Sequence, residues 1–219
     1  MHNTVQNLIH IEDQVKSKIQ NLNKTRIPKI IAVSKTFSID KIFPLIDHGQ
    51  VDFGENKVQE AIDKWSDIKN KNKNIKLHLI GGLQTNKVKF ALKIFDYIHS
   101  VDSERLAVKI ANEQIKQNKK IKIFIQVNIG NEKQKSGIKK EEVLDFYNLC
   151  KNLNLDVIGT MCIPPQDKNS KNYFIEMNKI NIKLNLLDLS MGMSEDYMEA
   201  CINNATFLRI GSKIFGQRV

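Results

Sequence analysis

Several features that often reveal function are scarce or missing in this 219-residue sequence. Its three cysteines, Cys150, Cys162 and Cys201, are widely spaced and include no Cys-x-x-Cys pair. This spacing argues against a disulfide framework and a zinc site, and it indicates a reducing compartment. The five histidines form no His-x-x-x-His pattern, so we expect no metal site.

Nucleotide-binding glycine motifs and long apolar runs are also missing. The sequence contains neither GxGxxG nor GxxxxGK[ST], which argues against dinucleotide and P-loop sites. Apolar runs such as Val157-Ile158 are far shorter than the ~20 residues of a membrane-spanning helix. The N-terminus has no basic start followed by an apolar block, so we expect a cytoplasmic protein without a secretory signal.

Arginine is rare although the formal net charge is +10, since only four of the 34 basic residues are arginines. Proteins that read nucleic acids usually use arginine forks and stacked aromatic side chains. Here lysines are spread along the chain among asparagines, as in residues 70–74, a pattern that an AT-rich coding sequence produces. We therefore favour compositional drift over a nucleic-acid surface, and expect no specific nucleic-acid partner.

The apolar pattern that is present alternates between strand and helix. Alternation requires a parallel sheet with helices outside, and eight units favour a closed (β/α)8 TIM barrel over an open sheet. The length and the 41% hydrophobic content fit one domain, 1–219, with an extra N-terminal helix. Strands are predicted over 30–35, 51–54, 77–80, 97–100, 121–127, 157–161, 186–190 and 207–210, and helices over 3–22, 39–47, 58–65, 86–95, 103–117, 141–152, 172–184 and 197–201.

Three finer expectations accompany this α/β pattern. Residues 70–74 read as a surface loop. Leu106, Ile110 and Ile115 approximate one apolar helix face. Asp52 and Glu55 could form an acid–base pair, although acids at helix starts are commoner.

A lysine stands at the end of the first predicted strand. The run Ile30–Val33 predicts a strand buried on both faces, and after Ser34 comes Lys35, where an α/β fold collects its ligands. The alternative is a lysine that extends to solvent from a strand end.

Two turns rich in small residues follow the last two predicted strands, at 190–194 and 210–212. Small residues let backbone N–H groups approach an anion, and phosphate sites recur after strands seven and eight of this fold. Each turn alone is explained by ordinary turn glycines. Both turns beside a strand-end lysine favour a phosphate site.

An unprotonated lysine amine forms a Schiff base with a carbonyl compound. A carbonyl compound that also carries phosphate is either pyridoxal phosphate or a phosphorylated sugar. Arg209 can point inward by strand alternation, and a guanidinium facing a pyridine nitrogen would keep that nitrogen unprotonated and weaken the electron sink. An ordinary surface pair with a carboxylate is the alternative for Arg209.

The sequence closely resembles the pyridoxal phosphate homeostasis proteins (the YggS/PROSC family), which are alanine racemase N-terminal-domain-like. The resemblance spans nearly the whole chain in order. It rests on residues 32–36, 53–56 with 58–60, 78–81 with 83–87, 126–128, 135–137, 190–194 with Asp196, and 209–212 with 214–216.

The resemblance implies a single barrel of fold-type III that binds pyridoxal 5'-phosphate (PLP), with Lys35 holding it as an internal aldimine. Ser194, Gly211 and Ser212 match phosphate-binding positions, and Arg209 matches the arginine that faces the pyridine nitrogen. Asn56 and Met161 match positions that line the cofactor. Departures from the family pattern are small: Gly82 replaces a bulkier residue, Ser212 a threonine, and Asn204 a glycine, asparagine being the next best residue for φ > 0.

Three functions remain open on the sequence. Family membership implies a protein that is not an enzyme and has no catalytic residue; it buffers PLP, a vitamin B6 cofactor, and supplies it to PLP-dependent apo-enzymes. The second candidate is an amino-acid racemase. Racemisation needs two bases, and in the larger racemases the second base comes from a separate β domain for which we expect no room in this chain. The third is a lysine aldolase acting on a phosphosugar. We expect a monomer.

Overall fold

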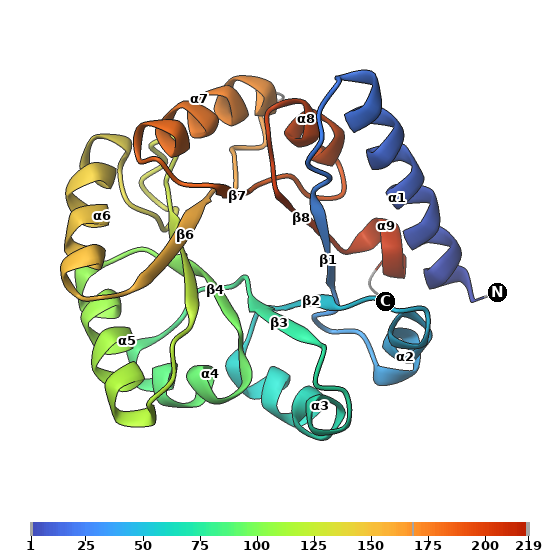
Figure 1. Ribbon diagram of the computed structural model, residues 1–219, viewed down its shortest axis with the longest axis horizontal. Helices are drawn as coiled ribbons and strands as arrows, with labels where there is room; N and C mark the ends of the chain where they lie inside the picture. Colours follow the sequence, from blue (N-terminus) through green and yellow to red (C-terminus); the bar gives the residue numbers. More distant parts are fainter. Residues whose placement is uncertain (1, 168, 218–219) are drawn as a thin grey trace.

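A computed structural model describes residues 2–167 and 169–217. Eight parallel strands close into a barrel in chain order, and helices surround it (Figure 1). This confirms the predicted (β/α)8 architecture; the termini of the predicted domain, residues 1 and 218–219, lie outside the described residues. The strands are β1 Lys29–Val33, β2 Asp52–Glu55, β3 Lys76–Leu79, β4 Tyr97–Val101, β5 Lys122–Gln126, β6 Asp156–Met161, β7 Asp188–Ser190 and β8 Phe207–Ile210.

Helices cover the outside of the barrel, and a helix precedes the first strand as predicted. That helix, α1 (Asn3–Asn21), buries Val5, Leu8, Ile11, Val15 and Ile19, spaced three or four residues apart, so they form one apolar stripe. The stripe lets α1 pack against α2, α8 and α9 (Figure 1). The other helices are α2 Ile39–Asp47, α3 Val58–Lys71, α4 Val88–Ile94, α5 Glu104–Gln117, α6 Val143–Asn152, α7 Ser170–Lys183, α8 Tyr197–Ile202 and α9 Ser212–Phe215, with short 3-10 turns at Thr85–Lys87 and Lys140–Glu142.

Two of the finer expectations need correction. The predicted loop over 70–74 is right for residues 72–74, but its first two residues belong to the helix α3, which continues to Lys71 because Ile68 extends its buried side. Ile115 is 79% exposed, whereas Leu106 and Ile110 are buried. Ile115 follows Ile110 by five residues, which rotates it by about 140° around the helix and away from the buried face.

The barrel interior holds a small apolar cluster, separate from the larger core between the strands and the helices. It consists of Ile31, Val33, Tyr97, Phe124, Met161 and Phe207. Strand register places polar side chains on the same inner side, since Arg209 pairs with Ile31 and Ser190 pairs with Met161. The interior is therefore partly polar, and this polar part lies beneath the strand ends where ligands bind in this fold.

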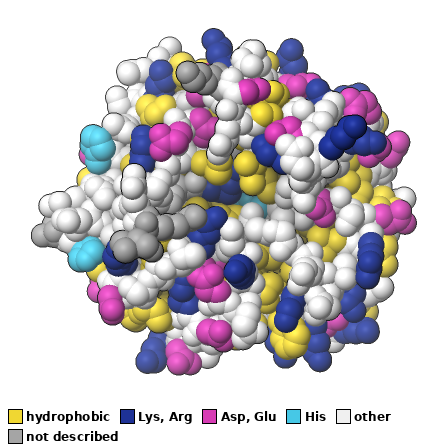
Figure 2. All heavy atoms as spheres, turned by 180° about the vertical axis from the view of Figure 1, so that it is seen from behind, with side chains coloured by type: hydrophobic (Ala, Val, Ile, Leu, Met, Phe, Trp, Pro, Cys, Tyr) yellow, Lys and Arg dark blue, Asp and Glu magenta, His cyan; other side chains and the backbone are white. Residues whose placement is uncertain are grey.

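Among the described residues, no helix is both long and apolar enough to cross a membrane. Figure 2 shows the face opposite to that of Figure 1, where Lys and Arg side chains are spread among Asp and Glu side chains rather than gathered in one stripe. The basic charge is thus distributed over this face, as the dispersed lysines of the sequence indicate.

Candidate functional site at the carboxyl ends of the strands

The predicted site residues gather at one end of the barrel, because the carboxyl ends of parallel strands meet there. Ala32 of β1 pairs with Ile210 of β8, so the segment that carries Lys35 lies beside the segment that begins with Gly211. Phe37 stacks on Phe215 of α9 with ring centroids 4.9 Å apart, which joins the two segments beyond the strands. Lys35 itself is half-buried.

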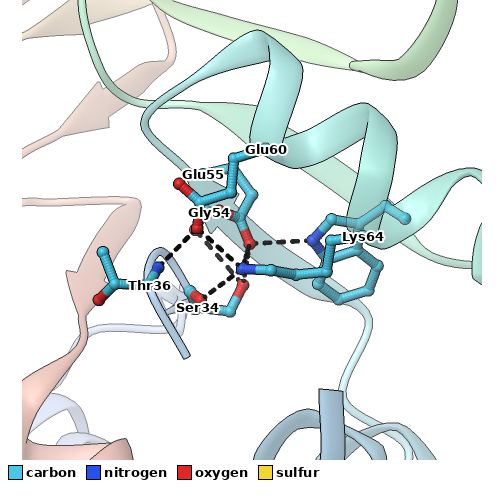
Figure 3. Close-up of polar contacts among 7 residues, drawn as sticks. Ser34, Thr36, Gly54, Glu55, Glu60 and Lys64 are labelled. Atoms are coloured by element: carbon cyan, nitrogen blue, oxygen red, sulfur yellow. Dashed lines mark hydrogen bonds and ion pairs between the residues drawn. The ribbon is translucent and has the colours of Figure 1, made fainter. Parts of the chain in front are cut away.

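The residues on both sides of Lys35 are held by a cluster of charged side chains from β2 and α3 (Figure 3). The buried Ser34 hydroxyl donates to Glu55 Oε1 at 2.8 Å, and the Ser34 carbonyl accepts from Lys64 Nζ at 3.0 Å. The Thr36 amide donates to Glu60 Oε1 at 2.6 Å. We call Glu55, Glu60 and Lys64 the lysine clamp, because they fix the backbone that positions Lys35.

The backbone at Thr36 explains the need for such a clamp. Its φ is +68°, in the left-handed region, which a β-branched residue rarely enters. This conformation costs an L-residue about 1–2 kcal/mol. The bond from the Thr36 amide to Glu60 offsets the strain, so the turn that carries Lys35 depends on α3.

Glu55 is the buried centre of the clamp. Its Oε1 accepts from Ser34, from Lys64 Nζ at 3.0 Å and from Trp65 Nε1 at 2.9 Å, whereas its Oε2 has no hydrogen-bond partner among the described residues. Burial raises the pKa of Glu55, against the opposing effects of the Trp65 hydrogen bond and the Lys64 charge. Lys64 also pairs with Glu60 at 3.0 Å, so one lysine joins both clamp carboxylates.

The suggested acid–base pair of Asp52 and Glu55 is wrong. Asp52 begins β2 and accepts from His78 within the barrel, whereas Glu55 ends β2 and faces α3. The two carboxylates lie at opposite ends of one strand and on its two sides.

The turn after β7 lies against the start of α9. Ser194 Oγ accepts from the Lys213 amide at 3.4 Å, and Asp196 Oδ1 accepts from the Met193 amide at 2.6 Å. Gly192 has φ +87°, and a Cβ there would lie 2.5 Å from the Ala200 Cβ, so this turn requires glycine. Ser194 thereby lies next to the segment formed by Gly211 and Ser212.

Asn56 and Met161 occupy two other strand ends. Asn56 is half-buried directly after β2, and its carbonyl oxygen lies so close to Gly81 that a Cβ there would approach to 2.4 Å. Met161 ends β6 and is fully buried in the interior cluster. The two residues lie at the same end of the barrel as Lys35, Asn56 in the loop beside it and Met161 below the opening.

Arg209 points into the barrel, as strand alternation allows, and is only 4% exposed. Its Nη1 donates to Ser190 Oγ at 2.7 Å, and its Nη2 donates to the Cys162 carbonyl at 2.8 Å. Burial lowers the pKa of Arg209, but a guanidinium stays charged at any working pH. A buried cation whose two hydrogen bonds go to neutral oxygens suits an electron-rich ligand atom nearby.

Sequence reasoning missed the buried polar side chains below Arg209. His78 and His99 are fully buried in the barrel and hydrogen-bonded to each other, and His99 also contacts Ser190. A signal for them exists in the sequence, because a histidine within a buried strand is costly unless it is paired. No group of three or more metal-ligating side chains occurs in the described part of the chain.

The alanine racemase N-terminal domain family matches this chain over residues 9–219. The pyridoxal phosphate homeostasis protein of Pasteurella multocida is 35% identical over 225 residues, which cover 97% of each chain. The protein of the same name from Haemophilus influenzae is 36% identical over 224 residues, covering 97% of this chain and 94% of its own.

Solved structures agree with this relationship. PipY of Synechococcus elongatus, solved without PLP, has a TM-score of 0.80 at 30% identity and covers 92% of this chain and 100% of its own. PipY with PLP bound has a TM-score of 0.75 at 29% identity over the same shares of the two chains. Alanine racemase of Clostridium difficile shares the fold, with a TM-score of 0.73 at 17% identity, and 57% of its length is covered. The chain belongs to the alanine racemase N-terminal domain family and, within it, to the pyridoxal phosphate homeostasis proteins.

Proposed function

We propose that this protein binds PLP reversibly at the carboxyl ends of the strands and serves in PLP homeostasis by buffering the cofactor and supplying it to apo-enzymes. The observation that carries the proposal is the placement of Lys35 just after β1 and of Arg209 on the neighbouring strand β8, with a small-residue turn beside them. The names of the relatives and the PLP-bound form of PipY support it. We further propose that it acts as a monomer and that it resides in the cytoplasm. The free, buried cysteines are consistent with such a reducing compartment.

The residues present fit the chemistry of this cofactor. The Lys35 amine is the group that would form a C=N bond with the aldehyde, with release of one water molecule. Ser194, Gly211 and Ser212 would hold the phosphate through a hydroxyl group and backbone N–H groups. Arg209 would donate to the pyridine nitrogen, and Asn56 and Met161 would line the ring. The cofactor supplies an aldehyde and an electron-accepting ring.

The charge at Arg209 favours holding the cofactor over driving turnover. A protonated pyridine nitrogen makes the ring a stronger electron sink, and a permanent cation beside that nitrogen disfavours protonation, so the sink is weakened. Arg209 is buried and already fixed by two hydrogen bonds, so it cannot move away without leaving Ser190 and the Cys162 carbonyl. We therefore propose a carrier without a turnover reaction, with racemisation as the alternative.

Absorbance of the purified apo-protein titrated with PLP tests the proposal. We expect a visible band that is absent in Lys35→Ala and in Lys35→Arg, because the guanidinium keeps a positive charge but forms no C=N bond. Lys57→Ala removes an exposed lysine near the site and is the matched control, with wild-type absorbance expected. A wild-type protein that stays colourless with added PLP would overturn the proposal.

Two further assays separate carrier from enzyme. Loaded wild-type protein is mixed with a PLP-dependent apo-enzyme, and recovery of that enzyme's activity measures supply, with Lys35→Ala as the unloaded control. The loaded protein alone is then incubated with single enantiomers of amino acids. Activation of the apo-enzyme without D/L interconversion supports the carrier, whereas interconversion that depends on Lys35 supports the racemase.

A further inference from the structure

A continuous chain of polar side chains crosses the interior of the barrel. Asp52 Oδ1 lies 2.9 Å from His78 Nε2, and His78 Nδ1 lies 3.0 Å from His99 Nε2. His99 Nδ1 lies 2.9 Å from Ser190 Oγ, which accepts from Arg209 Nη1 at 2.7 Å. We call Asp52, His78, His99 and Ser190 the interior relay. Its members come from four strands, β2, β3, β4 and β7, and it ends at Arg209 on β8.

The hydrogen positions in the relay follow from its two ends. The Asp52 carboxylate oxygen accepts, so His78 Nε2 carries the hydrogen toward Asp52. A neutral His78 then accepts at Nδ1, which requires a hydrogen on His99 Nε2. His99 Nδ1 accepts in turn, so the Ser190 hydroxyl donates to it and its lone pairs face Arg209. Every donor in the relay points away from Arg209 and toward Asp52.

The surroundings keep both histidines neutral and fixed. Both are 0% exposed, and burial lowers the pKa of His78 and, to a greater extent, that of His99, which also lies near His78 and Arg209. The His78 ring stacks on Tyr97 with centroids 4.2 Å apart, and the His99 ring stacks on Phe124 at the same separation. Rings held in this way have no freedom to turn and exchange partners.

The relay connects the two ends of the barrel. Asp52 is the first residue of β2, pairs with the first residue of β3 and is 14% exposed at its side chain. Arg209 is the third of four residues in β8, near the end where the site lies. A carboxylate at the amino ends of the strands is thereby linked through neutral groups to the cation beneath the site.

We propose that Asp52, His78, His99 and Ser190 are positioning residues that orient the Arg209 guanidinium toward the ring of the bound cofactor. The proposal rests on the proposed function, in which Arg209 faces the pyridine nitrogen. With the Ser190 hydrogen committed to His99, the serine lone pairs hold Nη1 and fix the plane of the guanidinium. An arginine oriented before binding loses less side-chain freedom when the cofactor arrives, so the relay tightens binding.

Asp52→Asn tests the relay from its far end. An asparagine amide donates as well as accepts, so it permits the opposite orientation of every hydrogen in the relay. We expect PLP to bind about tenfold more weakly to Asp52→Asn and to Ser190→Ala, the effect of misplacing one charge-assisted hydrogen bond. Asp156→Asn is the matched control, since Asp156 also begins a strand but is exposed; its affinity should equal that of the wild type.

The double variant separates a relay from independent structural roles. In a relay, Asp52→Asn has no further effect once Ser190→Ala has broken the link, so the double variant should bind PLP like Ser190→Ala alone. If the two substitutions together weaken PLP binding by the product of their separate factors, the proposal is overturned. Thermal unfolding of each apo-protein identifies any variant that binds weakly because it is poorly folded.

Nitrogen-15 NMR of the histidine rings in the apo-protein reports which ring nitrogen carries the hydrogen, and so tests the relay without the cofactor. Only five histidines need assignment, and His78→Gln and His99→Gln identify the buried pair. We expect both rings to be neutral with hydrogen on Nε2, and Asp52→Asn to shift both toward Nδ1. A charged ring or an Nδ1 hydrogen in the wild type would overturn the relay. Failure of the wild type to bind PLP would instead overturn the proposed function, whatever the histidine spectrum shows.

Discussion

The turn that carries Lys35 stores backbone strain, and this strain has a measurable consequence for cofactor binding. Thr36 holds φ at +68°, at a cost of about 1–2 kcal/mol for an L-residue. Its amide donates to the Glu60 carboxylate at 2.6 Å, and hydrogen bonds to charged groups contribute about 1.5–3 kcal/mol. Since Glu60 is only partly exposed, this bond is sufficient to hold the strained turn.

Glu60→Ala removes the acceptor, so we expect Thr36 to relax to negative φ and to carry the Lys35 amine away from its place. Regaining the strained turn on binding then costs about 1.4 kcal/mol, which corresponds to about tenfold weaker binding of PLP. Glu60→Gln keeps an oxygen that accepts from Thr36 but loses the pair with Lys64. It should weaken binding by only about two- to threefold.

Thr36→Gly is the compensating change, because glycine enters the left-handed region at no steric cost. Added to Glu60→Ala, it should restore most of the lost affinity, measured by absorbance titration with PLP beside thermal unfolding of each apo-protein. The reasoning is refuted if Glu60→Ala binds PLP like the wild type, or if Thr36→Gly fails to restore binding to the Glu60→Ala protein.

Three further predictions concern stability. Burial lowers the pKa of both His78 and His99, so below pH 6.5 the unfolded chain takes up protons that the folded protein does not. Stability should therefore fall as the pH drops below that value, by up to about 1.4 kcal/mol per pH unit for each histidine; a flat profile in urea unfolding would contradict this. Asn204 has φ +67°, so Asn204→Gly should stabilise the folded protein by about 0.5 kcal/mol and Asn204→Ala should destabilise it by about 1 kcal/mol. If the alanine variant were the more stable of the two, the backbone at this position would not be strained. Gly192→Ala combines backbone strain with a 2.5 Å contact and should lower the stability by about 2–4 kcal/mol. In Gly49→Ala the new Cβ meets nothing within 4 Å, so the stability should fall by only about 1–2 kcal/mol. Equal losses in the two variants would show that crowding at Gly192 is unimportant.

Much of the architecture was predictable because the relevant signals are local. Alternating apolar periods gave the order of strands and helices, and the polar residue after each buried run marked the end of the barrel where ligands bind. Alternation along β8 was enough to allow Arg209 an inward position. The left-handed φ at Asn204 agrees with the expectation drawn from the family resemblance, in which asparagine is the next best residue after glycine for a positive φ.

The lysine clamp and the interior relay were not predictable, because their partners lie far apart in the sequence. His99 and Ser190 are separated by 91 residues and come from strands that are not neighbours in the barrel. Only closure of the barrel brings their side chains together across its interior. Thr36 gives no sign of its positive φ, because the cause is a carboxylate on a helix 24 residues later.

Covalent trapping tests the central proposal most directly. PLP is added to the apo-protein, the C=N bond is reduced with borohydride, and the labelled peptide is identified by mass spectrometry in the wild type and in Lys35→Ala. We predict one label per chain, located on Lys35, and none at stoichiometric level in Lys35→Ala. A label spread over the many surface lysines, or fixed on a lysine other than Lys35, would contradict the proposed function.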